Sequence, residues 1–124
     1  KPLTSIGWNI TPQSIYYVTK YVYERYRKPI YIAENGIACQ DFVFSDGKVH
    51  DPVRSEYLLL YLKELKRAQE NGVDVKGYFH WSLLDNFEWK QGYRQRFGLV
   101  YVDFKTGKRY KKDSFEFYKD IISK

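Results

Sequence analysis

VKGYFHWSLLDNFEW, residues 75–89, is the stretch that decides the fold class of this chain. Its first part, Val75–Leu84, is nearly continuous in apolar side chains, which is typical of a strand covered on both faces. A second run of this kind, Ile30–Ala33, follows Pro29. We therefore expect two buried strands of the type found in parallel sheets.

An amphipathic helix is expected before each of these strands. Thr11-Pro12 supplies an N-cap and a first-turn proline for the first helix, and the second helix begins after Asp51-Pro52 and ends at Asn71-Gly72. Apolar side chains recur at helical spacing on one face of each helix: Ile15, Val18, Val22 and Tyr26 in the first, and Tyr57, Leu60, Tyr61, Leu65 and Ala68 in the second.

The remainder of the chain predicts a hairpin and a short helix. Leu99–Phe104 is expected to be a strand that Thr106-Gly107 turns into Lys108–Tyr110. A helix follows Asp113, with Glu116 completing a capping box. Strands that alternate with helices imply parallel βα units, and two parallel strands alone do not form a stable sheet. The layout therefore predicts α/β architecture and part of a larger α/β barrel.

Composition is that of a folded domain, with 124 residues, 44% hydrophobic and 19% aromatic. Aromatic side chains supply buried area, and they also stack on sugars and bases. The net charge of +6 permits nucleic-acid binding, but Lys and Arg are spread along the chain. The basic residues Lys105, Lys108, Arg109, Lys111 and Lys112 are interpreted as a solvated face. We expect no nucleic-acid partner.

Other features limit the cellular setting and the cofactors. No apolar run approaches the about 20 residues of a membrane-spanning helix, so no membrane partner is expected. The single Cys39 fits a reduced, cytoplasmic location. His80 has no second metal-spaced group and is interpreted as a satisfied core histidine, so we expect no metal and no cofactor. The chain lacks Met and opens with Lys1-Pro2, which indicates a processed, truncated or excised piece.

Glu34 follows directly after the first expected strand, and Asn35-Gly36 permit a sharp turn behind it. In a βα barrel, the C-terminal end of a strand is where catalytic groups lie. A carboxylate at this position can act as a nucleophile, a base or a metal ligand. The local pattern alone favours a solvated loop glutamate.

The second strand ends in a cluster that includes Trp81, Glu88 and Trp89. Flat aromatic faces suit the C–H groups of a sugar, and carboxylate or amide oxygens suit its hydroxyls. Taken singly, Trp81 and Phe87 can be core aromatics and Glu88 an exposed carboxylate. As a cluster at a strand end, these residues favour a sugar site.

These motifs resemble those of glycoside hydrolase family one. Tyr31–Gly36 is similar to the family pattern Y-I-T-E-N-G, and Gly77–Trp89 to G-Y-x-x-W-S-L-x-D-N-F-E-W. Further matches follow in order at Val49–Asp51, Gly92-Tyr93, Arg96–Asp103 and Lys112–Ser114. The resemblance spans essentially the whole chain. It implies that residues 1–124 are the C-terminal portion, the last two to three βα units, of a single TIM (β/α)8 barrel domain.

The resemblance also implies a role for each site residue in a retaining β-glucosidase. Glu34 would be the catalytic nucleophile, and Trp81 would form the floor beneath the sugar. Glu88 would bind the sugar's outer hydroxyls with Trp89 beside it, and Phe97 would line the pocket near the hydroxymethyl group. The family leads us to expect a cis peptide after Trp81. Two departures are Ala33, where the family usually has Thr, and Lys90, which replaces a commoner small or acidic residue.

The retaining mechanism needs two carboxyl groups about 5–5.5 Å apart. The resemblance places the second in an N-E-P motif, and this sequence contains none. We therefore expect the N-terminal remainder of the same barrel as a partner and no activity from the chain alone. A carboxylate at Glu88 would repel a phosphate, so the expected substrate is an unphosphorylated β-D-glucoside or β-galactoside.

Two other functions stay open at the level of the sequence. One is a carbohydrate-binding module that uses Trp81, Glu88 and Trp89 without catalysis. The other is a structural or self-associating barrel fragment without a ligand.

Overall fold

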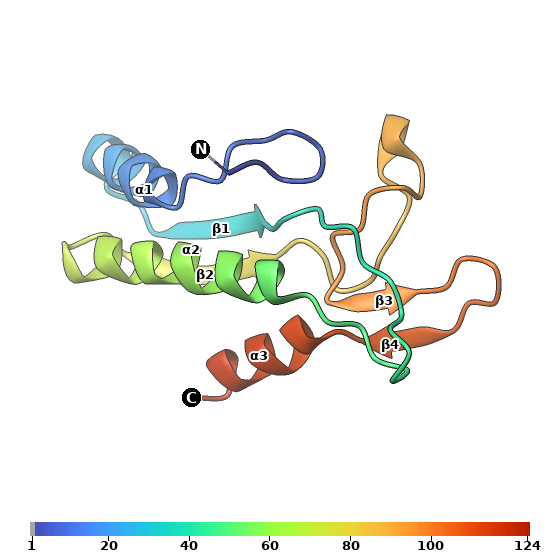
Figure 1. The fold of residues 1–124 in the computed structure, drawn as a ribbon. Coiled ribbons are helices and arrows are strands. Elements are labelled where there is room, and N and C mark those ends of the chain that lie inside the picture. The colour runs from blue at the N-terminus through green and yellow to red at the C-terminus, as the bar shows by residue number, and fades with distance from the viewer. Residues whose placement is uncertain (1) are drawn as a thin grey trace.

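The computed structural model describes residues 2–124 (Figure 1). Three helices, a 3-10 turn and four strands follow in the order α1 (Gln13–Tyr26), β1 (Ile30–Asn35), α2 (Pro52–Glu70), β2 (Val75–His80), η1 (Trp89–Gln91), β3 (Val100–Val102), β4 (Arg109–Lys111) and α3 (Asp113–Ile122). Helix α2 contacts both α1 and α3. The core lies between this helical layer and β1–β2, where Ile15, Tyr61 and Leu65 pack with Ile32 and Tyr78.

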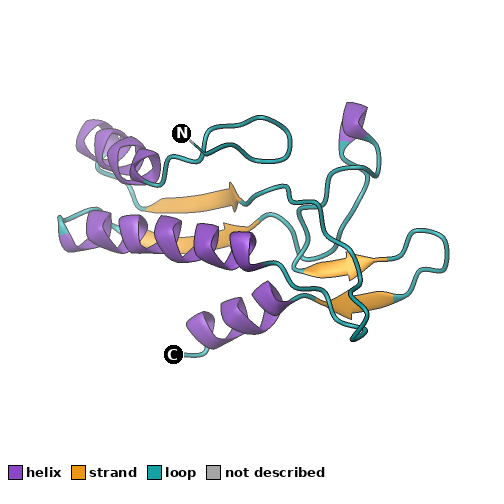
Figure 2. Cartoon of the chain, in the orientation of Figure 1, coloured by secondary structure: helices purple, strands orange, loops and turns teal. Residues whose placement is uncertain are grey.

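Strands β1 and β2 pair in parallel, as the alternation of strands and helices predicts. Both strands run toward the same end of the molecule, where the loops, η1 and the β3–β4 hairpin gather (Figure 2). This end corresponds to the carboxyl ends of the strands, the position that carries catalytic groups in βα barrels.

The predicted helices exist, but the buried side of α1 differs from the predicted stripe. Ile15 is buried, whereas Val18 and Tyr26 are each 60% exposed and Val22 is also exposed. The buried side chains of α1 are Ile15, Tyr16 and Thr19. Helix α1 packs on α2 through this other side, where the Arg67 guanidinium lies 3.5 Å from the centre of the Tyr16 ring. The other members of the apolar stripe, Val18, Val22 and Tyr26, are therefore left exposed.

The strands are shorter and less covered than the sequence predicts. Strand β2 ends at His80 rather than Leu84, because Ser82 bonds through its backbone to Phe97 and Leu99 instead of to β1. Tyr31 on β1 is 61% exposed and Phe79 on β2 is 59% exposed. Each strand is thus covered on one face only. The antiparallel β3–β4 hairpin is confirmed, with Gly107 in its turn at φ +74°.

The predicted N-terminal side-chain caps of the three helices are wrong, whereas α2 ends at Asn71-Gly72 as predicted. Helix α1 begins after Pro12 without a side-chain cap. The Asp51 carboxylate caps α3 instead of α2, since it accepts hydrogen bonds from the Ser114 backbone N–H at 2.9 Å and hydroxyl at 2.5 Å. Asp113 does not form a capping box with Glu116, because its carboxylate bonds to His50 at 2.6 Å. Long-range partners have replaced the local ones.

Candidate active site

A cavity of about 390 Å³ opens at the carboxyl ends of β1 and β2. All five residues singled out from the sequence line it: Glu34, Trp81, Glu88, Trp89 and Phe97. Phe97 is buried, whereas Trp89 is 82% exposed. The structure therefore brings together, from four separate segments, a carboxylate at the end of β1, aromatic rings and a second carboxylate.

The two strand ends are held together by a close backbone approach. The Trp81 N–H donates to the Asn35 carbonyl at 2.9 Å. A Cβ atom on Gly36 would lie 1.8 Å from the Trp81 carbonyl oxygen, so only glycine fits at this position. The Trp81–Ser82 peptide is cis, as the resemblance predicts. Gly36 thus has a packing role in addition to the turn expected from the sequence.

Glu88 and Trp89 are presented by the η1 turn. The Glu88 N–H donates to the Gly92 carbonyl at 2.8 Å, which closes this turn. Trp89 adopts φ +44°, a left-handed conformation that costs a non-glycine residue about 1 kcal/mol or more. In Figure 1, η1 projects away from the body of the molecule, at the end toward which β1 and β2 run.

Trp8 and Tyr57 also line this cavity, and sequence reasoning missed both. Trp8 lies in a turn closed by the Leu3–Asn9 bridge, and its ring centre is 6.3 Å from that of Phe97. Gly7, at φ +82°, is the local signal for this turn. Tyr57 was predicted only as a member of the apolar stripe of α2. It is buried against Tyr61, with ring centres 4.0 Å apart, and burial raises the pKa of its hydroxyl.

A buried network of charges lies behind the cavity. It joins three carboxylates to three cations: Asp41, Asp51 and Asp85 to Arg54, Arg96 and Lys112. Lys112 Nζ donates to Asp41 at 2.6 Å and to Asp85 at 2.8 Å. Arg54 pairs with Asp51 and, at 2.7 Å, with Asp41. The network ties the loops after β1 and β2 to the first turns of α2 and α3.

The placement of Lys112 corrects its interpretation as part of a solvated face. Lys112 is 1% exposed, and its burial lowers the pKa of the ammonium group while Asp41 and Asp85 oppose this effect. Its neighbour Lys111 has the exposed position that was predicted for both. The hydrogen bonds of Lys112 span up to 71 positions of sequence, so no local pattern reveals its burial.

His80 differs from the satisfied core histidine that was expected. Neither ring nitrogen has a hydrogen-bond partner among residues 2–124. Burial, together with the positive charges of Arg54 and Lys112, lowers the pKa of His80 to about 4. The ring lies beside Tyr118 of α3, with ring centres 5.9 Å apart. His80 is therefore a neutral side chain next to the charge network at neutral pH.

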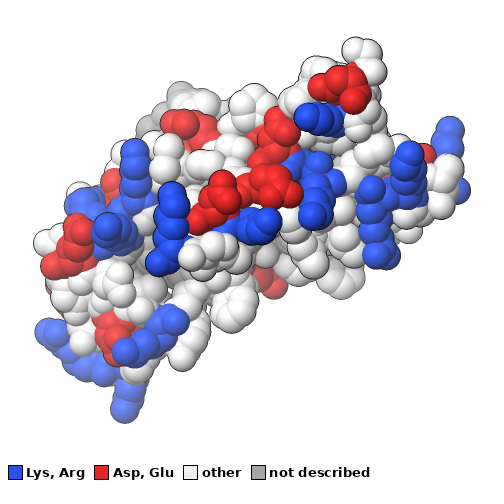
Figure 3. Space-filling view, turned by 90° about the horizontal axis from the view of Figure 1, so that it is seen from below, with Lys and Arg blue, Asp and Glu red and all other residues white. Residues whose placement is uncertain are grey.

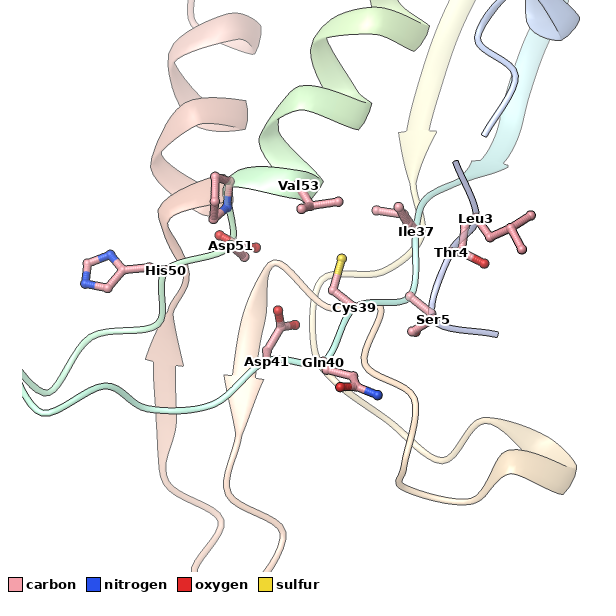
Figure 4. Close-up of a pocket in the computed structure, with 12 residues that line it drawn as sticks. Leu3, Thr4, Ser5, Ile37, Cys39, Gln40, Asp41, His50, Asp51 and Val53 are labelled. Carbon is pink, nitrogen blue, oxygen red and sulfur yellow. The ribbon is translucent and has the colours of Figure 1, made fainter. Parts of the chain in front are cut away.

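A second cavity, of about 250 Å³, is lined by the loop that follows β1 and by the start of α2 (Figure 4). Cys39, Asp41 and His50 are among its lining residues. Burial raises the pKa of the Cys39 thiol to about 11, so it stays protonated at neutral pH. Asp41 is committed to Arg54 and Lys112. This arrangement does not supply an activated nucleophile.

The remaining surface has mixed charge. On the face shown in Figure 3, Lys and Arg side chains are interspersed with Asp and Glu. Among residues 2–124, no group of three or more His, Cys, Asp or Glu side chains has the arrangement of a metal site. Within the same range, no helix is both long enough and apolar enough to cross a membrane.

Comparison with known proteins identifies the relatives of this chain. β-Glucosidase A of Thermotoga maritima is 50% identical over 122 residues, which cover 98% of this chain and 27% of that protein. The 6-phospho-β-galactosidase of Leptotrichia buccalis is 46% identical, with 97% and 26% covered. The structure of the family 1 β-glucosidase from Thermotoga maritima in complex with isofagomine lactam superposes with a TM-score of 0.97 at 49% identity, covering 98% of this chain and 28% of that one.

The chain thus spans about a quarter of the length of these relatives. It matches a part of their α/β barrel. The family model for glycosyl hydrolase family 1 matches residues 1–124. The chain belongs to glycosyl hydrolase family 1.

Proposed function

We propose that residues 1–124 are the C-terminal portion, the last two to three βα units, of a single (β/α)8 barrel domain that hydrolyses β-D-glucosides with retention of configuration. The observation that carries the proposal is the shared cavity, in which Glu34 lies at a strand end with Trp81, Glu88, Trp89 and Phe97. Aromatic faces beside carboxylates have the chemistry of a sugar site.

Glu34 is the nucleophile in this proposal. Its carboxylate attacks the anomeric carbon and forms a glycosyl ester, which water then hydrolyses. A second carboxylic acid protonates the leaving oxygen and later activates the water. We assign this second residue to the N-terminal remainder of the barrel, the proposed partner of the chain. The reaction requires no cofactor, because two carboxyl groups and water account for every bond made and broken.

Glu88 is assigned to the hydroxyls of the sugar, and its charge sets the substrate class. A phosphate at close range to the Glu88 carboxylate would be repelled, an effect that grows as the cavity excludes water. Unphosphorylated β-D-glucosides, with β-galactosides as the alternative, are therefore the proposed substrates. The similarity to a 6-phospho-β-galactosidase makes this a necessary test, since overall identity does not separate the two classes.

The thiol and the surface charges bear on the cellular setting of the enzyme. The single, protonated Cys39 supports a cytoplasmic location. The mixed charges of the surface support a protein without a nucleic-acid partner. We propose neither a membrane nor a nucleic acid as a partner.

The decisive experiment replaces Glu34 by glycine in the complete barrel. Turnover of an activated β-glucoside should fall by several orders of magnitude, since the covalent step is lost. Azide should restore cleavage and give the α-glycosyl azide, because a single displacement inverts the β configuration whereas two displacements retain it. Glu24→Ala removes an exposed carboxylate of α1 and serves as the control, with unchanged turnover.

Two results would contradict the assignment. Normal turnover by Glu34→Gly without azide would leave Glu34 as a solvated loop residue. A β-glycosyl azide product would identify a different carboxylate as the nucleophile. The isolated chain should show no turnover, because it lacks the acid that contributes roughly 10²–10⁴-fold; activity of the purified chain alone would mean that Glu34 and Glu88 suffice.

A further inference from the structure

Glu34 lies where β1 departs from regular pairing with β2. Ile32 is opposite Tyr78 and Asn35 is opposite His80, so Ala33 and Glu34 together face the single residue Phe79. Two residues against one define a β-bulge, a feature that re-aims side chains and is frequent beside active sites.

The bulge changes which side of the sheet each side chain of β1 occupies. Ile30 and Ile32 pack into the core below the helices, and Tyr31 between them is exposed. Strict alternation would send the side chain at position 34 to the same side as Ile32. Instead Ala33 and Glu34 are both exposed and Asn35 is half-buried. The extra residue therefore turns Glu34 out to the cavity and turns Asn35 toward the helices.

Asn35 is fixed by three hydrogen bonds to three different elements. Its carbonyl accepts the Trp81 N–H at 2.9 Å. Its side-chain oxygen accepts the Tyr78 hydroxyl at 2.8 Å, and its amide nitrogen donates to the Tyr57 hydroxyl at 3.1 Å. Tyr57 is itself held in the core by its stacking on Tyr61. An amide is suited to this position because it donates and accepts at once.

We propose that Asn35, held by the Tyr57 and Tyr78 hydroxyls, is the positioning residue for Glu34. Its side-chain hydrogen bonds to Tyr57 and Tyr78 hold the backbone of the bulge in place and so fix the direction of the Glu34 carboxylate. Asn35 acts through Glu34 and takes no part in bond making. The inference rests on the proposed function, in which Glu34 is the nucleophile.

The first test is a set of variants in the complete barrel. Asn35→Ala should lower kcat by about 10²-fold, the effect of misplacing a reacting group by about 1 Å. Tyr57→Phe and Tyr78→Phe should each lower kcat by about tenfold, the factor of one lost hydrogen bond. KM should stay within about threefold for all three, since a pinned bulge orients the nucleophile rather than the sugar.

Tyr118→Phe is the matched control. The Tyr118 ring lies 6.4 Å from that of Tyr78, and its hydroxyl makes no hydrogen bond to Asn35, whose side-chain oxygen accepts from Tyr78. Its removal should leave kcat unchanged. An equal loss in Tyr118→Phe and Tyr78→Phe would show that general packing, not the hydrogen bond to Asn35, explains the effect.

The second test separates positioning from a structural role. In the Glu34→Gly variant, azide takes the place of the carboxylate as the attacking group. Because azide is not attached to the backbone, its direction of attack does not depend on the bulge that Asn35 holds. Asn35→Ala should therefore leave the azide-restored rate within about threefold, although it costs about 10²-fold when Glu34 is present. A role in general folding would lower both rates alike.

The two tests fail in different ways. If Glu34→Gly keeps normal turnover, the nucleophile assignment is wrong, and the inference falls with it. If azide restores Glu34→Gly but Asn35→Ala lowers the restored rate by the full factor, the proposed function stands and the positioning role of Asn35 is overturned. Normal kcat in Asn35→Ala would overturn that role as well.

Discussion

Two regions of the molecule differ in how fully their side chains find partners within the chain. The charge network behind the cavity consists of Asp41, Asp51, Asp85, Arg54, Arg96 and Lys112. The open face consists of apolar side chains on the strands and on α1, namely Tyr31, Phe79, Val18 and Val22. The first region is closed and the second is exposed to water.

The charge network is balanced within the chain. Three negative and three positive side chains pair in it, and the Asp85 carboxylate also accepts the Gly98 N–H at 3.0 Å. Buried charges persist only when they are paired and hydrogen-bonded. The buried Nε of Arg54 has no hydrogen-bond partner among residues 2–124, but each charged group of the network is paired, so the loops that carry the cavity are anchored by contacts within the chain.

The open face lacks such partners. Burying a large apolar side chain contributes about 1.5–3 kcal/mol to stability. The exposed side chains of Tyr31, Phe79 and Val18 do not make this contribution. The comparison shows that the charge network is paired within the chain, whereas the sheet and α1 leave large apolar side chains exposed. This agrees with a chain that matches about a quarter of the barrels of its relatives.

The largest expected effect comes from breaking the charge network at Arg54. Arg54→Met in the complete barrel should lower the free energy of unfolding by about 3–5 kcal/mol, because it leaves Asp51 and Asp41 buried with an uncompensated charge. Denaturant unfolding measures this change. Lys111→Met removes an exposed cation beside the network and should change stability by less than about 0.5 kcal/mol. Equal effects in both variants would show that the network contributes nothing beyond surface charge.

The next effect concerns His80, which borders the network without a partner. Its pKa is about 4 in the folded chain against 6.5 unfolded, so the unfolded state binds a proton first as the pH falls. The effect of His80 on the free energy of unfolding is therefore absent above about pH 6.5. As the pH falls from there toward about 4, His80 lowers the free energy of unfolding by up to about 3 kcal/mol. His80→Leu should flatten this decrease, as measured by unfolding at a series of pH values.

His50 provides a control of opposite sign. Its pKa is raised by hydrogen bonds to Asp113 and Asp46, so its contribution is present at low pH and is lost as the pH rises through the raised pKa. His50→Gln should therefore lower stability at acidic and neutral pH and remove the decrease on the alkaline side, while the slope of the acidic decrease that comes from His80 stays the same. The prediction for His80 fails if the acidic decrease is the same in His80→Leu as in the unaltered protein.

The sequence predicted the elements well because their signals are local. Helical spacing located α1 and α2, and apolar runs located β1 and β2. The family motifs named five residues that the structure brings to one cavity. The buried side of α1 was wrong, because Tyr16 and Thr19 are buried with Ile15 whereas Val18, Val22 and Tyr26 are exposed.

The errors share one physical cause, which is distance along the sequence. Asp51 was predicted to cap the helix that follows it, but its partner is Ser114, 63 positions away. Lys112 was grouped with exposed neighbours, although Asp41 and Asp85 draw it inside. Trp8 precedes every predicted strand, so no local pattern placed it at the cavity. Polar partners over such distances become visible only once the fold is known.

A smaller effect is expected at Gly36, where the two strand ends meet. Gly36→Ala should lower stability by about 1–3 kcal/mol, because the new Cβ would lie 1.8 Å from the Trp81 carbonyl oxygen and the backbone must move. Turnover should fall as well, since Trp81 and Glu34 line the same cavity. In the control Gly77→Ala, the nearest atom at 2.8 Å belongs to the Tyr31 ring, which can rotate away. Equal losses in stability would show that the contact with Trp81 is relaxed at little cost.

The smallest effect on folding, with the clearest effect on association, is expected at the open face. Val18 is 60% exposed on α1, and Tyr31 and Phe79 are exposed on the strands. In the isolated chain, these side chains and the free strand edges should bring copies together. Val18→Lys should change the free energy of unfolding by less than about 0.5 kcal/mol, because the side chain already lies in water. It should nevertheless shift the isolated chain toward the monomer in analytical ultracentrifugation.

Ile122→Lys, at an equally exposed position on α3, should leave association unchanged, since α3 lies away from the open face. If the unaltered chain is monomeric at high concentration, or if both lysines act alike, the open face is not what drives copies of this chain together.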